Sequence, residues 1–210
     1  LWAPGQGLAP ERVLSMAAWF PPQGLSASLP GLRLLASIGA GAEHLLRDPA
    51  LPAHVPVTRI VDAEQARGMA EFVLWAALYY HRGLDHAQQQ QRQGLWRMPP
   101  QRPAAHTHVG IMGLGAMGEQ AARVLATHGF TVSGWARGRR VLPGVRTCAG
   151  EAEMDAFLRP LDVVVSLLPL TPQTRGLCDA RWFARLKPGA CLVNCGRGEQ
   201  VIIPDLLEAL

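Results

Sequence analysis

A glycine-rich hexapeptide constrains the fold more than any other part of this chain. It follows an apolar run at residues 107–112 and opens an amphipathic segment that extends to residue 127. Its residues are Gly113, Leu114, Gly115, Ala116, Met117 and Gly118. Gly113 permits a tight turn, Gly115 lets the backbone approach a pyrophosphate, and Gly118 lets helix and strand pack closely. Because such a strand-loop-helix unit presents free N–H groups to an anion, the pattern predicts a dinucleotide site, with a chance glycine turn as the alternative.

The residues around this loop alternate between two kinds of pattern. Apolar runs typical of strands cover residues 131–135, 162–168 and 190–195. Helical patterns cover 151–158 and 181–186, and Pro204 opens a last helix at its favoured first position. Strands that alternate with helices are typical of a parallel sheet with helices on both faces. The second half is therefore predicted to be a doubly wound α/β domain.

The first half is less regular and ends in a proline-rich interruption. We expect strands at 15–20, 32–37 and 57–61 and a helix at 66–80, where apolar residues recur at helical spacing. A polar surface helix is expected around the glutamines at 88–91, with Trp96 as its aromatic anchor. Residues 98–103 hold three prolines and predict a linker. The expected domains are thus residues 1–103 and 104–210.

Composition and charge limit the classes of partner. The 210 residues are 49% hydrophobic and 17% charged, which is typical of a compact protein with room for two modest domains. The net charge of +4 permits nucleic-acid binding, but the densest basic cluster, Arg137, Arg139 and Arg140, suits one phosphate group better than a duplex. No apolar run approaches the roughly 20 residues of a membrane span, and no signal peptide is evident. We expect a cytoplasmic protein that binds neither nucleic acid nor membrane.

The four cysteines do not predict a metal site. Cys148, Cys178, Cys191 and Cys195 match no common zinc spacing. Cys191 and Cys195 fall on one face of an expected buried strand. We interpret the thiols as small apolar side chains and expect no metal.

The end of the second strand in this half predicts which dinucleotide is preferred. A site for NAD would offer a carboxylate to the ribose hydroxyls about 20 residues after the glycine loop. The chain instead has Ala136, Arg137, Arg139 and Arg140 there, and no acidic residue lies between positions 119 and 151. Guanidinium groups bind phosphate through charge-assisted hydrogen bonds. We predict that NADP is preferred, through Arg137 and one of the other two arginines; solvated surface arginines are the alternative.

Three further motifs follow the glycine loop and together resemble a known family. They are VVSLLPLTPQTRGL at 164–177, LKPGA at 186–190 and LVNCGRG at 192–198. The chain resembles the D-isomer-specific 2-hydroxyacid dehydrogenases, in particular their glyoxylate/hydroxypyruvate reductase group, and looser similarity extends through 37–44 and 69–71. The resemblance implies a Rossmann domain preceded by a smaller flavodoxin-like α/β substrate domain. It also implies NADPH-dependent reduction of small 2-keto acids, such as glyoxylate or hydroxypyruvate, and a homodimer.

The resemblance assigns roles to individual residues. Arg197 matches the catalytic arginine that holds the substrate carboxylate and polarises the keto oxygen, and an arginine that merely caps a strand end is the alternative. The backbone N–H groups of Ala40 and Gly41 match the loop that holds the other side of the carboxylate, although Glu43 stands where relatives commonly have Asp. The positions that match the cofactor lining near the nicotinamide are Leu168, Pro169, Thr174, Cys195 and Gly196.

The resemblance also implies a histidine that acts as general acid and a glutamate that tunes it, both further along the chain. The sequence reaches Leu210 before either position, and the family's first strand and helix have no counterpart. We therefore expect a fragment with two incomplete domains, inactive alone. None of the seven histidines follows a strand end near Arg197, so we expect no substitute acid.

Two other functions stay open at this point. The first is another D-2-hydroxyacid dehydrogenase or a phosphoglycerate dehydrogenase. A phosphorylated substrate would need extra basic residues in the loops of the first domain, and Arg33 and Arg59 do not decide between these enzymes. The second is a non-catalytic module that senses NADP(H), as corepressor relatives do. Arg197 favours the enzyme, because a sensor requires no carboxylate clamp.

Overall fold

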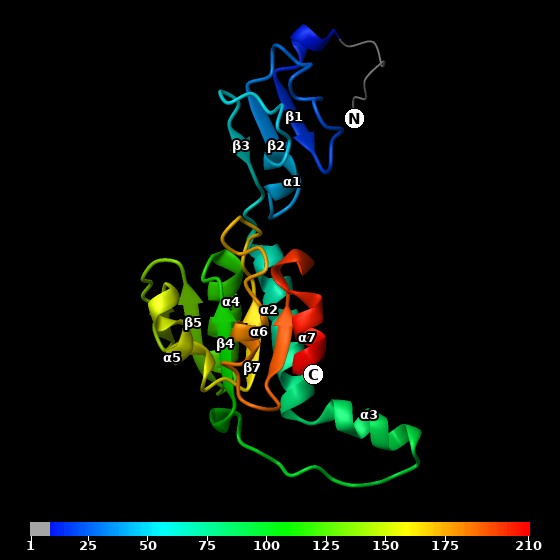
Figure 1. Ribbon diagram of the computed structural model, residues 1–210, viewed down its shortest axis with the longest axis vertical. Helices are drawn as coiled ribbons and strands as arrows, with labels where there is room; N and C mark the ends of the chain where they lie inside the picture. The colour runs from blue at the N-terminus through cyan, green and yellow to red at the C-terminus, as the bar shows by residue number, and fades with distance from the viewer. Residues whose placement is uncertain (1–8) are drawn as a thin grey trace. The chain divides into compact units, whose positions relative to one another are not determined.

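The computed structural model describes residues 9–210, which form two compact units. The first unit ends at Val61, and the second runs from Asp62 to Leu210 (Figure 1). Each unit is built on a parallel sheet.

The first unit is a small three-stranded sheet over a compact apolar core. Its elements are η1 (Pro10–Arg12), β1 (Ser15–Ala18), β2 (Leu34–Ser37), α1 (Glu43–Leu46) and β3 (Val57–Thr58). The strand order is β1-β2-β3, and both pairings are parallel. The core consists of Leu29, Leu32, Leu35, Leu45 and Val55. The three expected strands are thus confirmed, each somewhat shorter than its apolar run.

The second unit contains five parallel strands in the order β6-β5-β4-β7-β8. These strands are β4 (His108–Met112), β5 (Thr131–Ala136), β6 (Arg146–Ala149), β7 (Val163–Ser166) and β8 (Cys191–Asn194). The earliest strand lies in the middle, and the chain builds outward from it in both directions, which is the doubly wound order. Met112 pairs with Trp135 and with Ser166, and Ser166 pairs with Asn194. The carboxyl ends of four strands therefore meet at one edge of the sheet.

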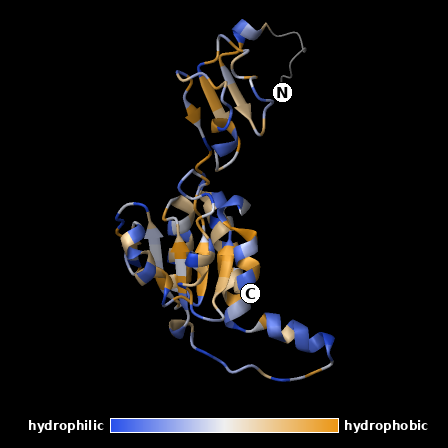
Figure 2. Cartoon of the chain, in the orientation of Figure 1, coloured by the Kyte–Doolittle hydropathy of each residue, from blue (hydrophilic) through white to orange (hydrophobic). Residues whose placement is uncertain are grey.

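Helices cover both faces of this sheet. The helices of the unit are α2 (Ala63–His81), α3 (Leu84–Arg92), α4 (Ala116–Thr127), α5 (Met154–Leu158), α6 (Ala180–Phe183) and α7 (Ile203–Ala209), with short turns η2 (Ala104–His106), η3 (Glu151–Glu153) and η4 (Gly198–Gln200). On one face, α2 and α4 pack over Val109 and Ile111. On the other, side chains of α5 and α6 pack over Met112 and Val164. Successive residues of a strand thus face opposite helical layers, and the strands form the apolar centre of the unit (Figure 2). The parallel strand order and the two helical layers confirm the expected Rossmann fold.

Helix α2 belongs to the second unit by packing, although the expected linker follows it in the sequence. Its residues Ala70, Val73 and Ala77 are buried in the same core cluster as α4. The compact units consequently divide at Val61 and not at the proline-rich segment. Residues 93–103 form no helix or strand, as their prolines predict, and they connect α3 to the start of the sheet. The functional division at residue 103 stays a prediction.

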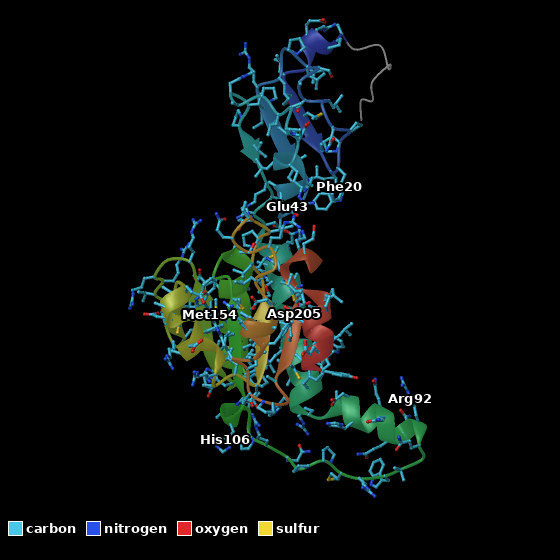
Figure 3. All side chains as sticks on the ribbon, viewed as in Figure 1. Phe20, Glu43, Arg92, His106, Met154 and Asp205 are labelled. Carbon is cyan, nitrogen blue, oxygen red and sulfur yellow. The ribbon has the colours of Figure 1, made fainter. Side chains whose placement is uncertain are left out.

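Helix α3 is confirmed as a polar surface helix, but its expected anchor is wrong. The helix buries no residue and is mostly hydrophilic (Figure 2), and Arg92 marks its far end (Figure 3). Trp96 is 91% exposed. Gly94 adopts a φ of +65°, and the Leu95 N–H donates to the Gln90 carbonyl at 2.9 Å, which ends the helix. Trp96 faces solvent although the chain still contacts the helix one residue later, where the Arg97 N–H donates to the Oε1 of Gln90 at 3.2 Å. Within residues 9–210, no helix is long and apolar enough to span a membrane.

Candidate functional site

The three glycines of the loop after β4 have different surroundings. Gly113 has a φ of +98°, and a Cβ there would lie 2.9 Å from the carbonyl oxygen of Leu167. A Cβ on Gly118 would collide with the carbonyl of Gly113, so its absence lets α4 pack against the end of β4. A Cβ on Gly115, by contrast, would meet nothing within 4 Å. Gly113 and Gly118 are therefore required by the fold itself, whereas Gly115 borders open space.

That open space lies at the amino end of α4. Gly115 is the N-cap, and no side chain caps the helix. The first intrahelical hydrogen bond runs from the Glu119 N–H to the Gly115 carbonyl at 2.8 Å, so the N–H groups of residues 116–118 have no partner within the helix. Uncapped N–H groups and the helix dipole favour an anion at this position. The loop thus fits a pyrophosphate.

The end of β5 places three arginines on the surface. Trp135, the last buried residue, donates its indole Nε1–H to the Gly150 carbonyl at 2.9 Å, which holds the strand end in place. Ala136 is half-buried, and the three arginines that follow are exposed. Arg139 donates to the Glu153 carboxylate at 2.9 Å. Within residues 9–210, the guanidinium of Arg137 makes no hydrogen bond or ion pair, and that of Arg140 makes none either.

Glu153 is a contributor that sequence reasoning missed. Its carboxylate accepts both from Arg139 and from the Ala149 N–H, at 2.7 Å for the latter. It lies 14 residues beyond Arg139 in sequence, and no local pattern marks the approach. One arginine of the three is therefore already paired with an acid, whereas Arg137 and Arg140 have no acidic partner within the described residues.

The segment after β7 forms a braced loop at the same edge of the sheet. Leu168 is 8% exposed and belongs to the core cluster on the α5 side. The Thr174 hydroxyl donates to the Pro169 carbonyl at 2.6 Å and accepts from the Thr171 N–H at 2.8 Å. Thr174 therefore stabilises the loop that contains Pro169. Contact of these residues with a cofactor stays a prediction.

The segment after β8 positions Arg197 by backbone contacts. The amide of Asn194 spans the turn, because its Nδ2 donates to the Arg197 carbonyl at 3.1 Å and its Oδ1 accepts from the Gly196 N–H at 3.0 Å. The Arg197 side chain is half-buried, and its Nη1 donates to the Gly196 carbonyl at 3.1 Å. Cys195 is half-buried against the core cluster on the α2 side. The glycine loop and the residues after β5, β7 and β8 thus meet at one edge, as expected for a ligand site in such a sheet.

Gln200 is a second residue that sequence reasoning missed. It is 1% exposed, and its amide hydrogen-bonds to the Arg197 N–H and to the carbonyls of Leu168 and Pro169. A glutamine in a short polar turn is usually solvated, so the sequence carries no signal of this burial.

The first unit holds the other predicted substrate contacts, in the loop after β2. The Ser37 hydroxyl donates to the Gly41 carbonyl at 2.6 Å and accepts from the Gly39 N–H at 3.2 Å. Arg59 donates to the Ala40 carbonyl at 3.3 Å. The N–H groups of Ala40 and Gly41 make no hydrogen bond within the described residues. The loop is thus held through its carbonyls, and its two N–H groups are able to bind an anion.

The cysteines behave as apolar side chains. Cys148 and Cys178 are buried, and Cys191 and Cys195 pack against one core cluster, as the sequence predicts. Burial raises the pKa of Cys178 to about 12 and that of Cys191 to about 11, so both thiols stay protonated at neutral pH. Among residues 9–210, no three His, Cys, Asp or Glu side chains gather as metal ligands.

Comparison with known proteins gives a consistent family. Residues 74–210 match the model of the D-isomer specific 2-hydroxyacid dehydrogenase, NAD binding domain. Glyoxylate/hydroxypyruvate reductase A of Serratia proteamaculans is 35% identical over all of this chain and 67% of that protein. The protein of the same name from Yersinia enterocolitica is 37% identical over 91% of this chain and 63% of its own length. The chain thus spans about two thirds of the length of these relatives.

Solved structures agree with the sequence relatives. A D-isomer specific 2-hydroxyacid dehydrogenase from Xanthobacter autotrophicus, in complex with NADPH and MES, is 40% identical with a TM-score of 0.94, over 99% of this chain and 67% of that one. An NADPH-dependent glyoxylate/hydroxypyruvate reductase from Sinorhizobium meliloti, in complex with NADP and sulfate, is 41% identical with a TM-score of 0.87, over 95% and 66%. By sequence, fold and motifs together, the chain belongs to the D-isomer specific 2-hydroxyacid dehydrogenase family.

Proposed function

We propose that this chain binds NADPH and carries the nucleotide and carboxylate sites of a reductase that converts small 2-keto acids, such as glyoxylate or hydroxypyruvate, to 2-hydroxy acids. One observation carries the proposal. The uncapped end of α4 faces open space at Gly115, at the sheet edge where Arg137 and Arg197 also follow strand ends. Membership of the family and the names of the relatives support the same reaction.

The charge at the end of β5 supports NADPH over NADH. A 2′-phosphate adds negative charge beside the adenosine ribose, and an unpaired guanidinium binds it without first breaking another ion pair. Arg137 and Arg140 meet that condition, whereas Arg139 is shared with Glu153. The two solved relatives described above contain NADPH or NADP, which is in line with this preference.

The residues of the chain supply binding and charge stabilisation. NADPH, when bound, supplies the hydride. The planar fork of Arg197 holds the substrate carboxylate in a fixed orientation and stabilises the negative charge that develops on the keto oxygen. In the first unit, the free N–H groups of Ala40 and Gly41 are able to bind a carboxylate. Arg197 is retained for this purpose, since a module that only senses the dinucleotide would not need it.

The proton for the keto oxygen comes, in this proposal, from a general acid outside these 210 residues. In the second unit, His108 starts β4 and hydrogen-bonds Ser133 at 3.1 Å, at the edge of the sheet opposite the glycine loop. His81 hydrogen-bonds to the Thr107 hydroxyl at the same edge, and His128 is the C-cap residue of α4. None of these histidines lies with Arg197. Steady reduction of glyoxylate by the isolated chain would contradict this part of the proposal.

A comparison of the two dinucleotides tests the proposal. We expect NADPH to bind at least about tenfold more tightly than NADH, as one charge-assisted contact to a phosphate provides, in titrations that follow nicotinamide fluorescence. Equal affinity, or tighter binding of NADH, contradicts the cofactor assignment. The same titration with the Gly115→Ala protein is the control for binding at the loop after β4.

We also propose that the protein forms a homodimer through the segment at 84–103. This segment exposes apolar side chains that nothing within the described residues covers, namely Trp96 at 91%, Met98 at 77% and Leu95 at 46%. Exposed apolar clusters of this kind mark interaction sites. Sedimentation analysis would show a dimer that the double substitution Trp96→Ser and Met98→Ser converts to monomer, while a monomeric parent protein would contradict the proposal.

A further inference from the structure

Gln200 joins the two loops that follow β7 and β8. Its Nε2 donates to the carbonyls of Leu168 and Pro169, each at 3.1 Å. Its Oε1 accepts from the N–H of Arg197, also at 3.1 Å. A primary amide has two donor hydrogens and one acceptor oxygen, and here both donors and the acceptor are used at a site that is 1% exposed. The side chain therefore fixes the backbone of one loop relative to the other.

The main chain of Gln200 is held separately from its side chain. The Cys178 N–H donates to the Gln200 carbonyl at 2.9 Å, and the Gln200 N–H donates to the Arg197 carbonyl at 3.1 Å. An isolated parallel bridge between Cys178 and Val201 continues this pairing. Replacing only the amide would consequently remove the link between the loops and leave the segment attached to its neighbour.

Gly196 makes room for this link. A Cβ at Gly196 would collide with the Oε1 of Gln200 and would lie 3.0 Å from the carbonyl oxygen of Leu168. The turn after β8 is thus packed around the buried amide, and the path of the backbone toward Arg197 depends on it. All partners of the Gln200 side chain in this arrangement belong to the chain itself.

We infer that Gln200 is a positioning residue for Arg197, an inference that rests on the function proposed above. Leu168 and Pro169 border the proposed place of the nicotinamide, and Arg197 holds the substrate carboxylate. Hydride transfer needs the reacting atoms within about 3–3.5 Å, and a displacement of about 1 Å is costly. By tying the backbone of Arg197 to the two carbonyls, Gln200 sets the spacing between substrate and cofactor without touching either.

The substitution Gln200→Met tests this role, because methionine keeps the length of the side chain and removes both donors and the acceptor. Gln173→Met, on an exposed residue of the loop after β7, is the matched control. Hydrogen exchange should show that protection of the Arg197 amide falls about tenfold in Gln200→Met, while that of the Cys178 amide, which bonds to the backbone carbonyl, is unchanged. The control should change neither amide.

Binding measurements on the full chain then separate positioning from stability. Oxalate, an unreactive dicarboxylate, serves as the probe for the carboxylate site in the presence of saturating NADPH. We expect Gln200→Met to weaken oxalate binding about tenfold and to leave the affinity for NADPH within about threefold. Gln200→His, whose neutral ring still donates one hydrogen bond and accepts another, should restore oxalate binding to within about threefold of the parent.

Other binding results contradict either the proposed function or the positioning role of Gln200. If the parent chain binds no NADPH, the proposed function fails and this inference falls with it. If the parent binds NADPH but not oxalate, the carboxylate role of Arg197 is wrong, and Gln200 has nothing to position. If the parent binds both ligands and Gln200→Met binds both equally well, or weakens both by the same factor, the positioning role is overturned while the proposed function stands. If the Cys178 amide also loses protection in Gln200→Met, the substitution has opened the whole segment. In that case, failure of Gln200→His to restore oxalate binding overturns the positioning role.

Discussion

Two glycines of the same loop have opposite surroundings, and substitution should separate their roles. At Gly115 a Cβ meets nothing within 4 Å, so Gly115→Ala should leave the unfolding midpoint almost unchanged. The added methyl group would occupy space that the pyrophosphate needs, and NADPH affinity should fall at least about tenfold. Gly118→Ala forces a Cβ onto the carbonyl of Gly113, and it should cost about 1–3 kcal/mol of stability.

Thermal unfolding and NADPH titration of both variants provide the measurement. The two variants act as controls for one another, because each adds one methyl group to one glycine of one loop. A large loss of stability in Gly115→Ala together with unchanged NADPH binding would contradict the placement of the pyrophosphate at the amino end of α4.

The three arginines after β5 should contribute unequally to binding of the 2′-phosphate. Arg137 has no partner within the described residues, so Arg137→Ala should weaken NADPH binding about tenfold or more and leave NADH unchanged. Arg139 is paired with Glu153, and Arg139→Ala should have a smaller effect. Fluorescence titration with both dinucleotides measures the difference. Equal weakening of NADPH and NADH in Arg137→Ala would assign this arginine to a part of the site that the two share.

At the scale of the elements, Asp162 joins three segments at the amino edge of the sheet. Its carboxylate accepts from the His108 N–H at 2.7 Å, from Arg102 at 2.8 Å and from Lys187 at 2.8 Å. The start of β4, the segment before it and the loop before β8 are thereby held together. Burial raises the pKa of Asp162, but the hydrogen bonds from His108, Lys187 and Arg102 outweigh burial and leave the pKa below its usual value.

The lowered pKa predicts the direction of the pH dependence. Because the folded state binds the Asp162 proton more weakly than the unfolded state, its stabilisation is complete above the unfolded pKa of about 4 and is lost as the pH falls through the folded value. Asp162→Asn should therefore cost about 1–3 kcal/mol at pH 7 and flatten the loss of stability in acid. Denaturant unfolding between pH 7 and pH 3 measures both effects. Glu64→Gln, which breaks an exposed pair with Arg67, is the control and should change little.

Elements with strong periodicity could be predicted from sequence, and short polar ones could not. The helix after the glycine loop is predicted and observed at the same residues, Ala116–Thr127, because its apolar face buries Ala121 and Leu125 at helical spacing. β6 (Arg146–Ala149) was not expected: its four residues begin with Arg and Thr, and an edge strand needs no apolar run. α1, a single turn, likewise leaves no periodic pattern.

The candidate site divides in the same way. The positions of the glycine loop, Arg137 and Arg197 after strand ends could be predicted, because strand ends in a parallel sheet meet at one edge and local motifs mark each end. Their contact with a ligand, and the role of Arg197 that the resemblance implies, stay predictions. The roles of Glu153 and Gln200 could not be predicted. Their contacts join residues that are 14 and 32 positions apart in the sequence, and only folding brings these residues together.

At the scale of the whole molecule, the position of α2 decides what can fold alone. Ala70, Val73 and Ala77 fill the core on one face of the five-stranded sheet, and the half-buried Met69 and Leu74 pack beside them. A chain that starts at residue 104, the predicted domain boundary, would expose this face to water. Burial of five such side chains provides several kcal/mol, which is comparable with the total stability of a domain of this size.

Residues 62–210 expressed alone should consequently unfold cooperatively and bind NADPH within about threefold of the full chain, whereas residues 104–210 should not fold. Circular dichroism melting curves and NADPH titration of the two pieces provide the measurement. The 104–210 piece with Val109→Ser and Ile111→Ser is the control for the uncovered apolar face. If that face prevents folding of the shorter piece, the less apolar strands should make this piece more soluble without restoring NADPH binding. If residues 104–210 fold and bind NADPH as well as residues 62–210 do, α2 is dispensable for folding. The folding unit would then begin at the boundary that the prolines predict, after residue 103, and not at Asp62, where α2 joins the packed unit.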